Sequence, residues 1–256
     1  MTTGGKLARL PAVARDGWRY PALRLQAKTR ETPLEALAAL GFDEDELRGH
    51  ARAFDALAPG LYAELAAAAA GAAGLEGEVA ARRLERPSAS SRDAKELLYL
   101  AVRALRPELV VETGTFNGAA SAFLLRGLED NGAGRLLSFD VAEAADALRV
   151  GLPSDREPGW LVPAGLRHRF ELVLGDVRRT LRPRLESEPP VDIFFHDSLH
   201  TTRQMLFEYR LAWRRLRSGG LLVSDDVFWN PAFWGFTKLH RVAFRHIGTV
   251  GVTRRP

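Results

Sequence analysis

The stretches Val191-Asp-Ile-Phe-Phe-His-Asp-Ser-Leu-His200 and Gly219-Gly-Leu-Leu-Val-Ser-Asp-Asp226 decide the fold of this chain. Each is a short run rich in Val, Ile, Leu and Phe that ends in carboxylates. Such a run is typical of a strand buried on both faces of a parallel sheet. Between them, residues 201–217 have the length and apolar spacing of an amphipathic helix. Strand, helix and strand together predict a βαβ unit, in which the two strands run parallel.

The carboxylates that follow these two strands are candidates for a metal site. Asp197, Asp225 and Asp226 are expected at the carboxyl edge of neighbouring strands, where open α/β sheets bind ligands. A single Asp at a strand end usually caps a helix or faces water. Three of them repel one another unless a positive charge lies between them, and a hard divalent cation prefers oxygen ligands. His200, three residues after Asp197, is placed to act as a base beside the cation.

From residue 90 onward the chain alternates between strand and helix patterns, which predicts a doubly wound, mostly parallel α/β sheet. The expected strands are 109–112, 135–139, 170–174, 191–195 and 221–224, and the expected helices are 90–105, 119–129, 142–150, 177–185 and 201–217. After the fifth strand we expect a short helix at 236–241 and two strands, 242–247 and 249–253, joined at Gly248. Residues 151–168 are rich in Pro and Gly and are expected to form a long loop, in which Trp160 is a candidate substrate contact.

Residues 1–89 show no strand pattern and are expected to form a helical extension beside a domain that covers residues 90–256. Thr32 and Pro33 favour the start of a helix that Gly41 ends. Two further helices are expected at 43–57 and 59–70. The extension carries no recognisable chemistry. A lid, an oligomerisation arm and simple packing remain open, so a homo-oligomer formed through it is one interpretation.

The composition narrows the class of protein. The 256 residues are 46% hydrophobic and 27% charged, which suits a globular domain, and the absence of Cys excludes disulfides, thiolate metal sites and a cysteine nucleophile. With neither a signal-peptide pattern nor a sufficiently long apolar run, we expect a cytoplasmic protein without a membrane partner. A net charge of +4 and a pI of about 9.7 at first favour a nucleic-acid partner. Only four basic residues are Lys, however, and the arginines are scattered, so we expect a solvated surface and no nucleic-acid partner.

The first strand runs into a glycine-containing turn, Val110-Val-Glu-Thr-Gly-Thr-Phe-Asn-Gly118. The dinucleotide fingerprint G-x-G-x-x-G is not met, because the next glycine after Gly114 is Gly118. The turn instead resembles the E-x-G-x-x-x-G first motif of class I S-adenosylmethionine-dependent methyltransferases. A tight turn without a ligand is the alternative. The resemblance implies that the cofactor is bound by residues of this turn, namely Glu112, Gly114, Thr115, Asn117 and Gly118.

Two acidic residues at the ends of the next strands extend the expected cofactor site. Asp140 closes the second strand, where a carboxylate can accept hydrogen bonds from a ribose diol. Asp176 follows the third strand, and the resemblance implies that it meets the adenine amino group. Each of them is equally suited to cap the helix that follows it.

The runs D-I-F-F-H-D-S-L-H and G-G-L-L-V-S-D-D-V resemble the metal-dependent O-methyltransferases, both the catechol and caffeoyl-CoA types and the macrocin and mycinamicin sugar types. The resemblance covers roughly residues 92–230. It implies that Asp197, Asp225 and Asp226 hold Mg²⁺ or another divalent cation. Catechol-type members carry Lys three residues after the first ligand, whereas His200 here is similar to the sugar-modifying members.

The resulting hypothesis is a metal-dependent O-methyltransferase that acts on a small-molecule hydroxyl, such as that of a sugar or another natural product. His200 would take the proton, and Phe228, Trp229, Phe233 and Trp234 would line the acceptor site or belong to the core. A metal-independent methyltransferase of the same fold is one alternative. A nucleotide-binding module without catalysis is another.

Overall fold

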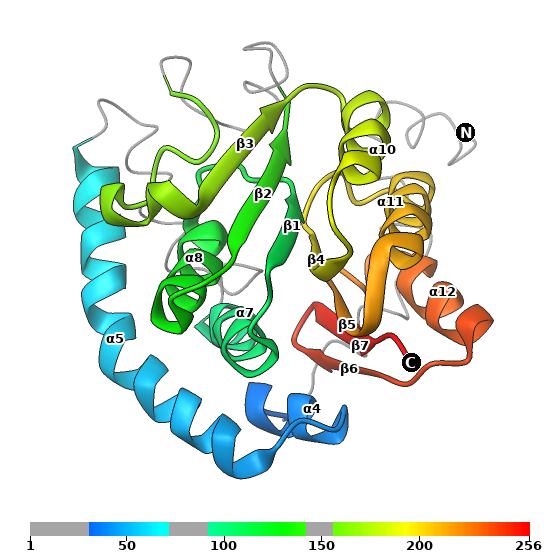
Figure 1. The fold of residues 1–256 in the computed structure, drawn as a ribbon, viewed down its shortest axis with the longest axis horizontal. Helices are drawn as coiled ribbons and strands as arrows, with labels where there is room; N and C mark the ends of the chain where they lie inside the picture. Colours follow the sequence, from blue (N-terminus) through cyan, green and yellow to red (C-terminus); the bar gives the residue numbers. More distant parts are fainter. Residues whose placement is uncertain (1–30, 72–91, 142–155) are drawn as a thin grey trace, which may run out of the picture.

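The computed structural model describes residues 31–71, 92–141 and 156–256, which contain a seven-stranded sheet with helices on both faces (Figure 1). The strand order is β3-β2-β1-β4-β5-β7-β6. Neighbouring strands pair in parallel from β3 to β5, and β7 pairs antiparallel with both β5 and β6. The predicted doubly wound, mostly parallel sheet is confirmed. The strands are β1 Leu109–Thr113, β2 Arg135–Asp140, β3 Phe170–Leu174, β4 Val191–His196, β5 Leu216–Ser224, β6 Phe244–Ile247 and β7 Val250–Arg254.

Successive strand residues face two separate hydrophobic cores, because side chains alternate across a sheet. Val110 and Ile193 belong to one core, while Val111 and Phe194 belong to the other. Both strands are buried throughout, as their unbroken apolar runs predict. The first core is covered by α4 Pro33–Ala39, α5 Glu44–Ala70, α7 Arg92–Leu105 and α8 Ala119–Asn131, and the second by α10 Val177–Ser187, α11 Thr202–Arg215 and α12 Ala232–His240.

The observed elements extend several of the predicted ones. The last predicted helix begins earlier, at Ala232, and the two terminal strands form a hairpin around Gly248. β5 begins at Leu216 and not at Leu221. The loop expected at 151–168 contains a 3₁₀ helix, η2, at Ala164–Arg169. The helix expected at 142–150 lies outside the described residues.

The break expected at Pro59 is wrong, because α5 is one helix of 27 residues that includes this proline. Proline removes a backbone N–H and crowds the preceding turn, which disfavours a helix interior. The helix nevertheless continues, since its buried face runs past Pro59 from Phe54 to Leu61 and Leu65. Packing of this face against the first core therefore outweighs the local preference.

The helices α4 and α5 share the first core with the sheet, and two arginines tie this segment to the carboxyl-terminal hairpin. Arg254 on β7 donates to the backbone oxygens of Leu40 (3.0 Å) and Gly41 (3.2 Å). Arg245 on β6 pairs with Glu31. The division of the chain at residue 89 into an extension and a domain stays a prediction.

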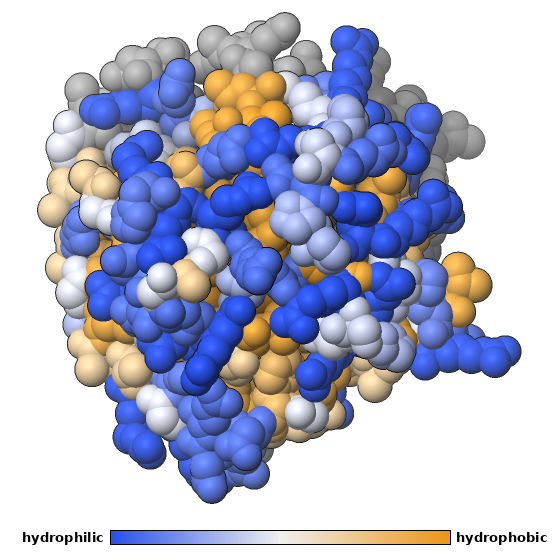
Figure 2. Space-filling model, viewed as in Figure 1, coloured by the Kyte–Doolittle hydropathy of each residue, from blue (hydrophilic) through white to orange (hydrophobic). Residues whose placement is uncertain are grey.

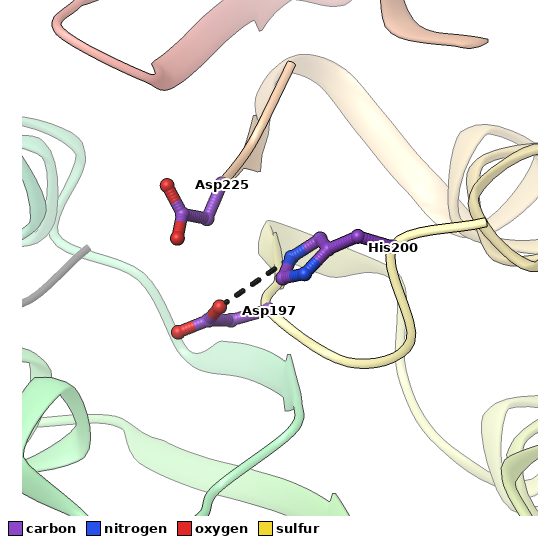
Figure 3. A group of neighbouring side chains, drawn as sticks. All are labelled: Asp197, His200 and Asp225. Carbon is purple, nitrogen blue, oxygen red and sulfur yellow. Dashed lines mark ion pairs between the residues drawn. The ribbon is translucent and has the colours of Figure 1, made fainter. Parts of the chain in front are cut away.

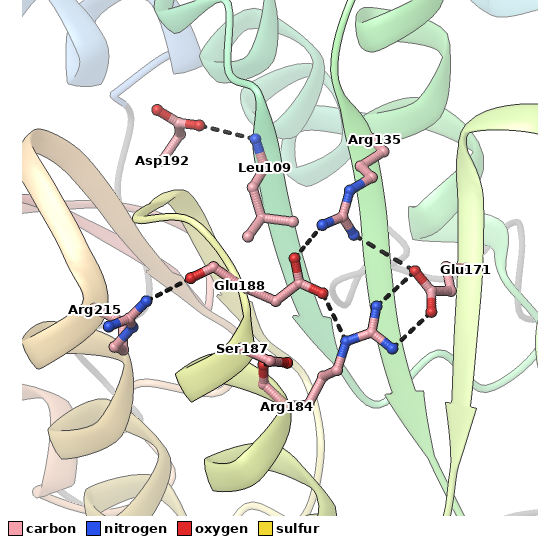
Figure 4. Close-up of polar contacts among 8 residues, drawn as sticks. All are labelled: Leu109, Arg135, Glu171, Arg184, Ser187, Glu188, Asp192 and Arg215. Atoms are coloured by element: carbon pink, nitrogen blue, oxygen red, sulfur yellow. Dashed lines mark hydrogen bonds and ion pairs between the residues drawn. The ribbon is translucent and has the colours of Figure 1, made fainter.

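At the amino edge of the sheet, opposite the ends that carry the candidate site, charged groups form a network (Figure 4). Arg184 donates to Glu188 (2.6 Å) and Glu171 (2.8 Å), and Arg135 at the start of β2 bridges the same two carboxylates. The network joins α10 to β2 and β3. Because most of these side chains are partly exposed, each pair stabilises the fold only modestly.

Hydrophilic residues cover most of the surface in the view of Figure 2, with smaller apolar areas between them. The large apolar side chains that the described part of the chain exposes are Leu174, Leu199, Trp234 and Leu239. Within that part, none of the helices has both the length and the apolar character needed to cross a membrane.

Candidate active site

The turn between β1 and α8 depends on its two glycines because the rest of the protein packs against them. Gly114 has φ +87°, and a Cβ at this position would lie 2.2 Å from the backbone oxygen of Asp197. Gly118 has φ +88°, and a Cβ there would lie 2.8 Å from Cα of Gly159. Both positions therefore need glycine for conformation and for space. Gly114 brings the end of β1 against the chain that follows β4.

Glu112 is fully buried beneath this turn. Its Oε2 accepts hydrogen bonds from Ser121 on α8 and Ser138 on β2, both at 2.6 Å. Its Oε1 is buried and has no hydrogen-bond partner among the described residues. Burial raises the pKa of Glu112 to about 7, although the two serines oppose the shift. An unpartnered buried carboxylate oxygen costs free energy unless a ligand satisfies it, so Glu112 fits a cationic group bound from the site.

The other predicted cofactor residues of the turn are nearly buried and connected. The hydroxyls of Thr115 and Ser138 lie 2.6 Å apart, and Asn117 accepts a hydrogen bond from the backbone N–H of Ala119 at 3.0 Å. Asn117 thereby satisfies one of the free N–H groups at the start of α8.

Asp140 at the end of β2 faces the same turn. Its carboxylate accepts from the backbone N–H groups of Phe116 (2.6 Å) and Val141 (2.7 Å). Burial raises the pKa of Asp140, and these hydrogen bonds oppose that shift. Asp176 is more exposed and caps α10 by accepting from the backbone N–H of Arg178 (2.9 Å). The structure therefore places Asp140 beside the turn, whereas Asp176 shows the capping contact that was its alternative.

Asp197, His200 and Asp225 converge where β4 and β5 end (Figure 3). One potential ligand atom from each lies within 4.8 Å of those of the other two. Parallel pairing of β4 with β5 produces this arrangement, because His196 is in register with Ser224 and the next residues are Asp197 and Asp225. The donors are two carboxylates and one imidazole, a set that divalent cations bind.

Asp226 lies on the other side of the histidine ring. Its Oδ2 is 3.6 Å from Nδ1 of His200, and the Nε2 of the same ring is 3.6 Å from Oδ1 of Asp197. Asp226 has φ +51°, a conformation uncommon for residues other than glycine, which turns the chain directly after Asp225. The structure thus gathers His200 with Asp197 and Asp225, and a ligand role for Asp226 stays a prediction.

The carboxylates of this cluster lie close enough to repel one another. Burial, together with Asp225, Asp226 and Glu112, raises the pKa of Asp197 well above its usual range. Burial and the neighbouring His196 lower the pKa of His200 to about 3, so its ring is neutral near pH 7. A cation between the carboxylates would relieve their repulsion, and the neutral ring can accept either a proton or a metal.

The sequence analysis missed Glu208, which lies on α11 beneath His200. This fully buried carboxylate accepts from Nδ1 of His196 and from the side chains of Ser198 and Gln204, each at 2.6 Å, and from Thr113 at 2.5 Å. The contacts join the ends of β1 and β4 to α11. The sequence did contain an indication of this buried carboxylate, because Glu208 lies between Met205 and Tyr209 on the apolar face of the predicted helix.

Two polar residues after β5 were also missed. Thr249, in the β6–β7 hairpin, donates from Oγ1 to Oδ1 of Asp225 at 2.8 Å. Asn230 is fully buried and donates to the backbone oxygen of His200 at 3.3 Å. The sequence carries no signal for either contact, because each joins loops that are distant along the chain.

The aromatic residues expected around an acceptor differ in their positions. Phe228 and Phe233 belong to the second core, which was the alternative to their lining a site, while Trp234 is 48% exposed. Trp160 packs partly buried against the first core, and its Nε1 is buried without a hydrogen-bond partner in the described part of the chain. A substrate contact for Trp160 stays a prediction.

Comparisons with known proteins concern the domain and the fold. A family model described as a methyltransferase domain matches residues 111–227, which include the β1 turn and both acidic strand ends. Comparison with curated proteins finds no matching sequence.

Two solved structures are similar in fold. The O-methyltransferase TomG from Streptomyces achromogenes, involved in tomaymycin synthesis and solved with S-adenosylmethionine, is 22% identical with a TM-score of 0.52, covering 75% of this chain and 90% of that one. An O-methyltransferase from Bacillus cereus, solved with S-adenosylhomocysteine, is 20% identical with a TM-score of 0.50, covering 70% and 90%.

Proposed function

We propose that the chain, whose residues 111–227 match a methyltransferase domain, transfers a methyl group from S-adenosylmethionine to a small-molecule hydroxyl with the help of a divalent cation. The observation that carries the proposal is the convergence of Asp197, His200 and Asp225 at the carboxyl edge of the sheet. Capping a helix does not require the acids to lie together. Bringing them together disfavours the charged form of Asp197, since burial and the neighbouring carboxylates raise its pKa.

The protein supplies the metal ligands and a base. Asp197 and Asp225 would hold the cation, with Asp226 as a further carboxylate beside His200. A bound divalent cation would lower the pKa of an acceptor hydroxyl that it touches. His200 would take the hydroxyl proton on a ring nitrogen, and because burial lowers the pKa of this ring to about 3, the role requires a hydroxyl whose own pKa is lowered as well. Asp197 and Asp226, each 3.6 Å from one ring nitrogen, stabilise the positive charge that the ring then carries.

The cofactor lies, in this proposal, along the ends of β1 and β2. S-adenosylmethionine would supply the methyl group. Asp140 would accept hydrogen bonds from its ribose, and Glu112 would offer its unpartnered Oε1 to a positively charged group. Glu112 lies on β1, which is next to β4, and Asp140 lies on β2, one strand further away, and this order supports a methyl donor beside the metal site.

We further propose a natural-product acceptor, such as a sugar hydroxyl. The histidine at position 200 and the fold shared with TomG support this class. The helices before residue 72 cover the first core, and a role for the extension in covering the acceptor or joining subunits belongs to the same proposal.

A test needs cofactor binding, metal binding and transfer as separate measurements. Thermal denaturation with S-adenosylhomocysteine, with and without Mg²⁺, should show stabilisation by the cofactor product and a further effect of the metal. Methyl transfer to a panel of hydroxylated acceptors should stop in excess EDTA and return with Mg²⁺ or Mn²⁺. Asp225→Asn should abolish the metal effect, whereas Asp45→Asn, at an exposed carboxylate on α5, should not.

Two outcomes would replace the proposal. Full transfer in excess EDTA would favour a metal-independent methyltransferase of the same fold. Absence of any stabilisation by S-adenosylhomocysteine would contradict the cofactor site itself.

A further inference from the structure

The carboxyl-terminal hairpin reaches the metal-ligand segment although it lies outside the matched methyltransferase domain, which ends at Val227. β7 pairs antiparallel with β5, with Gly251 opposite Ser224, so the turn before β7 lies beside the residues that follow β5. Thr249 is in this turn. It makes a side-chain hydrogen bond to Asp225 and a backbone hydrogen bond with Val227.

We propose that Thr249 is a positioning residue that sets the orientation of the Asp225 carboxylate toward the cation, an inference that rests on the proposed metal site. The Thr249 hydroxyl donates to Oδ1 of Asp225 at 2.8 Å. A carboxylate with one oxygen fixed by a donor loses rotation about its last bond, so its other oxygen keeps one direction. Hydrogen bonds from residues behind the ligands are a general means of orienting ligands and tuning metal affinity.

The hairpin is closely packed and hydrogen-bonded beside Asp225. The backbone N–H of Val227 donates to the carbonyl of Thr249 at 3.0 Å, so both ends of the Asp225–Val227 segment are held by one residue. A Cβ at Gly251 would lie within 2.8 Å of Phe233 and of Val227, which shows how closely the hairpin packs there. Ile247 is 4% exposed in the first core.

The contact also fits the electrostatics of the cluster. A potential ligand oxygen of Asp225 lies within 4.8 Å of one of Asp197, so the two carboxylates lie at short range. Rotation of the Asp225 side chain away from Asp197 would relieve their repulsion. The Thr249 hydroxyl opposes that rotation, which keeps the pair together before a cation arrives.

The experiment uses the full chain and Mn²⁺, whose binding is followed by the loss of the free-ion signal in electron paramagnetic resonance. Thr249→Val removes the hydroxyl at nearly constant volume and should weaken Mn²⁺ binding by about 10-fold or more. Thr249→Ala should do the same. Thr249→Ser keeps a hydroxyl and should bind within about 3-fold of wild type. Affinity for S-adenosylhomocysteine should be unchanged in all three.

The matched control is Thr253→Val in the same hairpin. Thr253 donates its hydroxyl to the backbone oxygen of Ala243 at 2.7 Å, and not to a carboxylate of the acidic cluster, so removing this hydroxyl should leave Mn²⁺ affinity at the wild-type value. Equal weakening by Thr253→Val would assign the effect to general loosening of the hairpin and would overturn the inference.

The remaining outcomes separate this inference from the proposed function. If wild type binds Mn²⁺ through Asp225 and Thr249→Val binds it equally well, only the role of Thr249 is wrong. If wild type binds no Mn²⁺, or Asp225→Ala binds as tightly as wild type, the metal site is wrong and the inference fails with it.

Discussion

Nδ1 of His196 lies 2.6 Å from Oε2 of Glu208, and neither side chain is accessible to solvent. Burial acts to raise the pKa of Glu208, but His196 and the hydrogen bonds of Ser198 and Thr113 outweigh it, so the pKa is lowered. A buried carboxylate with several donors is stable only while all of them are present. Glu208 therefore joins the ends of β1 and β4 to α11 directly behind His200.

Replacing Glu208 by Gln should destabilise the protein by about 2–4 kcal/mol, because the amide cannot accept from four donors. Urea unfolding followed by circular dichroism measures the change. Glu186→Gln, at an exposed ion pair of α10, is the control and should change stability by less than about 0.5 kcal/mol. Equal stability of Glu208→Gln and wild type would contradict a structural role for this carboxylate.

Gly114→Ala should prevent folding or cost about 3 kcal/mol or more, since the new Cβ would lie 2.2 Å from the Asp197 carbonyl. Gly132→Ala is the control, because it introduces backbone strain without a steric clash. Gly132 also has a positive φ, +70°, but its Cβ would meet nothing within 4 Å. It should therefore cost only about 1–2 kcal/mol. Similar unfolding midpoints for the two variants would show that the close approach of Gly114 to the backbone of Asp197 is not required for folding.

Asp140→Ala should weaken S-adenosylhomocysteine binding by about 1.5–3 kcal/mol, because a charged acceptor of ribose hydrogen bonds is lost. Titration calorimetry measures the affinity. Since Asp140 also accepts from Phe116 and Val141, thermal denaturation of the unliganded variant must accompany it. An unchanged dissociation constant would remove Asp140 from the cofactor site.

His200→Ala should reduce Mn²⁺ affinity far less than Asp225→Ala does, and should slow transfer by about 10²–10⁴-fold once an acceptor is found. The reason is that a base is needed only for the proton, whereas Asp225 is proposed to hold the ion. A loss of Mn²⁺ affinity in His200→Ala equal to that in Asp225→Ala would make His200 a ligand. The grouping of His200 with two carboxylates makes this comparison decisive.

Lys95 on α7 predicts a pH dependence of stability. Its ammonium is fully buried near the rings of Tyr62 and Phe123, and burial lowers its pKa from 10.5 to about 8. Between pH 8 and 10.5 the unfolded chain binds the proton and the folded chain does not, so stability rises with pH there. The free energy of unfolding of wild type, minus that of Lys95→Met, should rise by up to about 3 kcal/mol over this range. If urea unfolding gives a difference that does not change with pH, the lowered pKa of Lys95 is contradicted.

The parts of the structure predicted from the sequence are those governed by strand pattern and parallel pairing. The apolar runs before Asp197 and Asp225 indicated buried strands, and parallel neighbours bring their carboxyl ends to one edge. That logic places the two carboxylates together without any knowledge of side-chain contacts. His200 lies nearby because it is only three residues beyond Asp197 along the chain.

The residues that the sequence did not reveal depend on contacts between distant segments. Thr249 meets Asp225 only through the register of an antiparallel hairpin, and Glu208 collects donors from three different elements. Neither leaves a periodic pattern. At Pro59 the local rule was sound, but burial of one continuous helix face overrode it.

The contacts of Arg254 with Leu40 and Gly41 can form only at the end of synthesis of the chain. The turn between α4 and α5 emerges about two hundred residues before the arginine that fastens it, and the edge of β5 stays unpaired until β7 has been made. The early helices pack against α7, which is made soon after them, so the part left incomplete until the end of synthesis is the open edge of β5. An unpaired strand edge favours aggregation of a nascent chain. Fragments truncated just before residue 250 would keep that edge open and should aggregate, although they retain every predicted metal ligand.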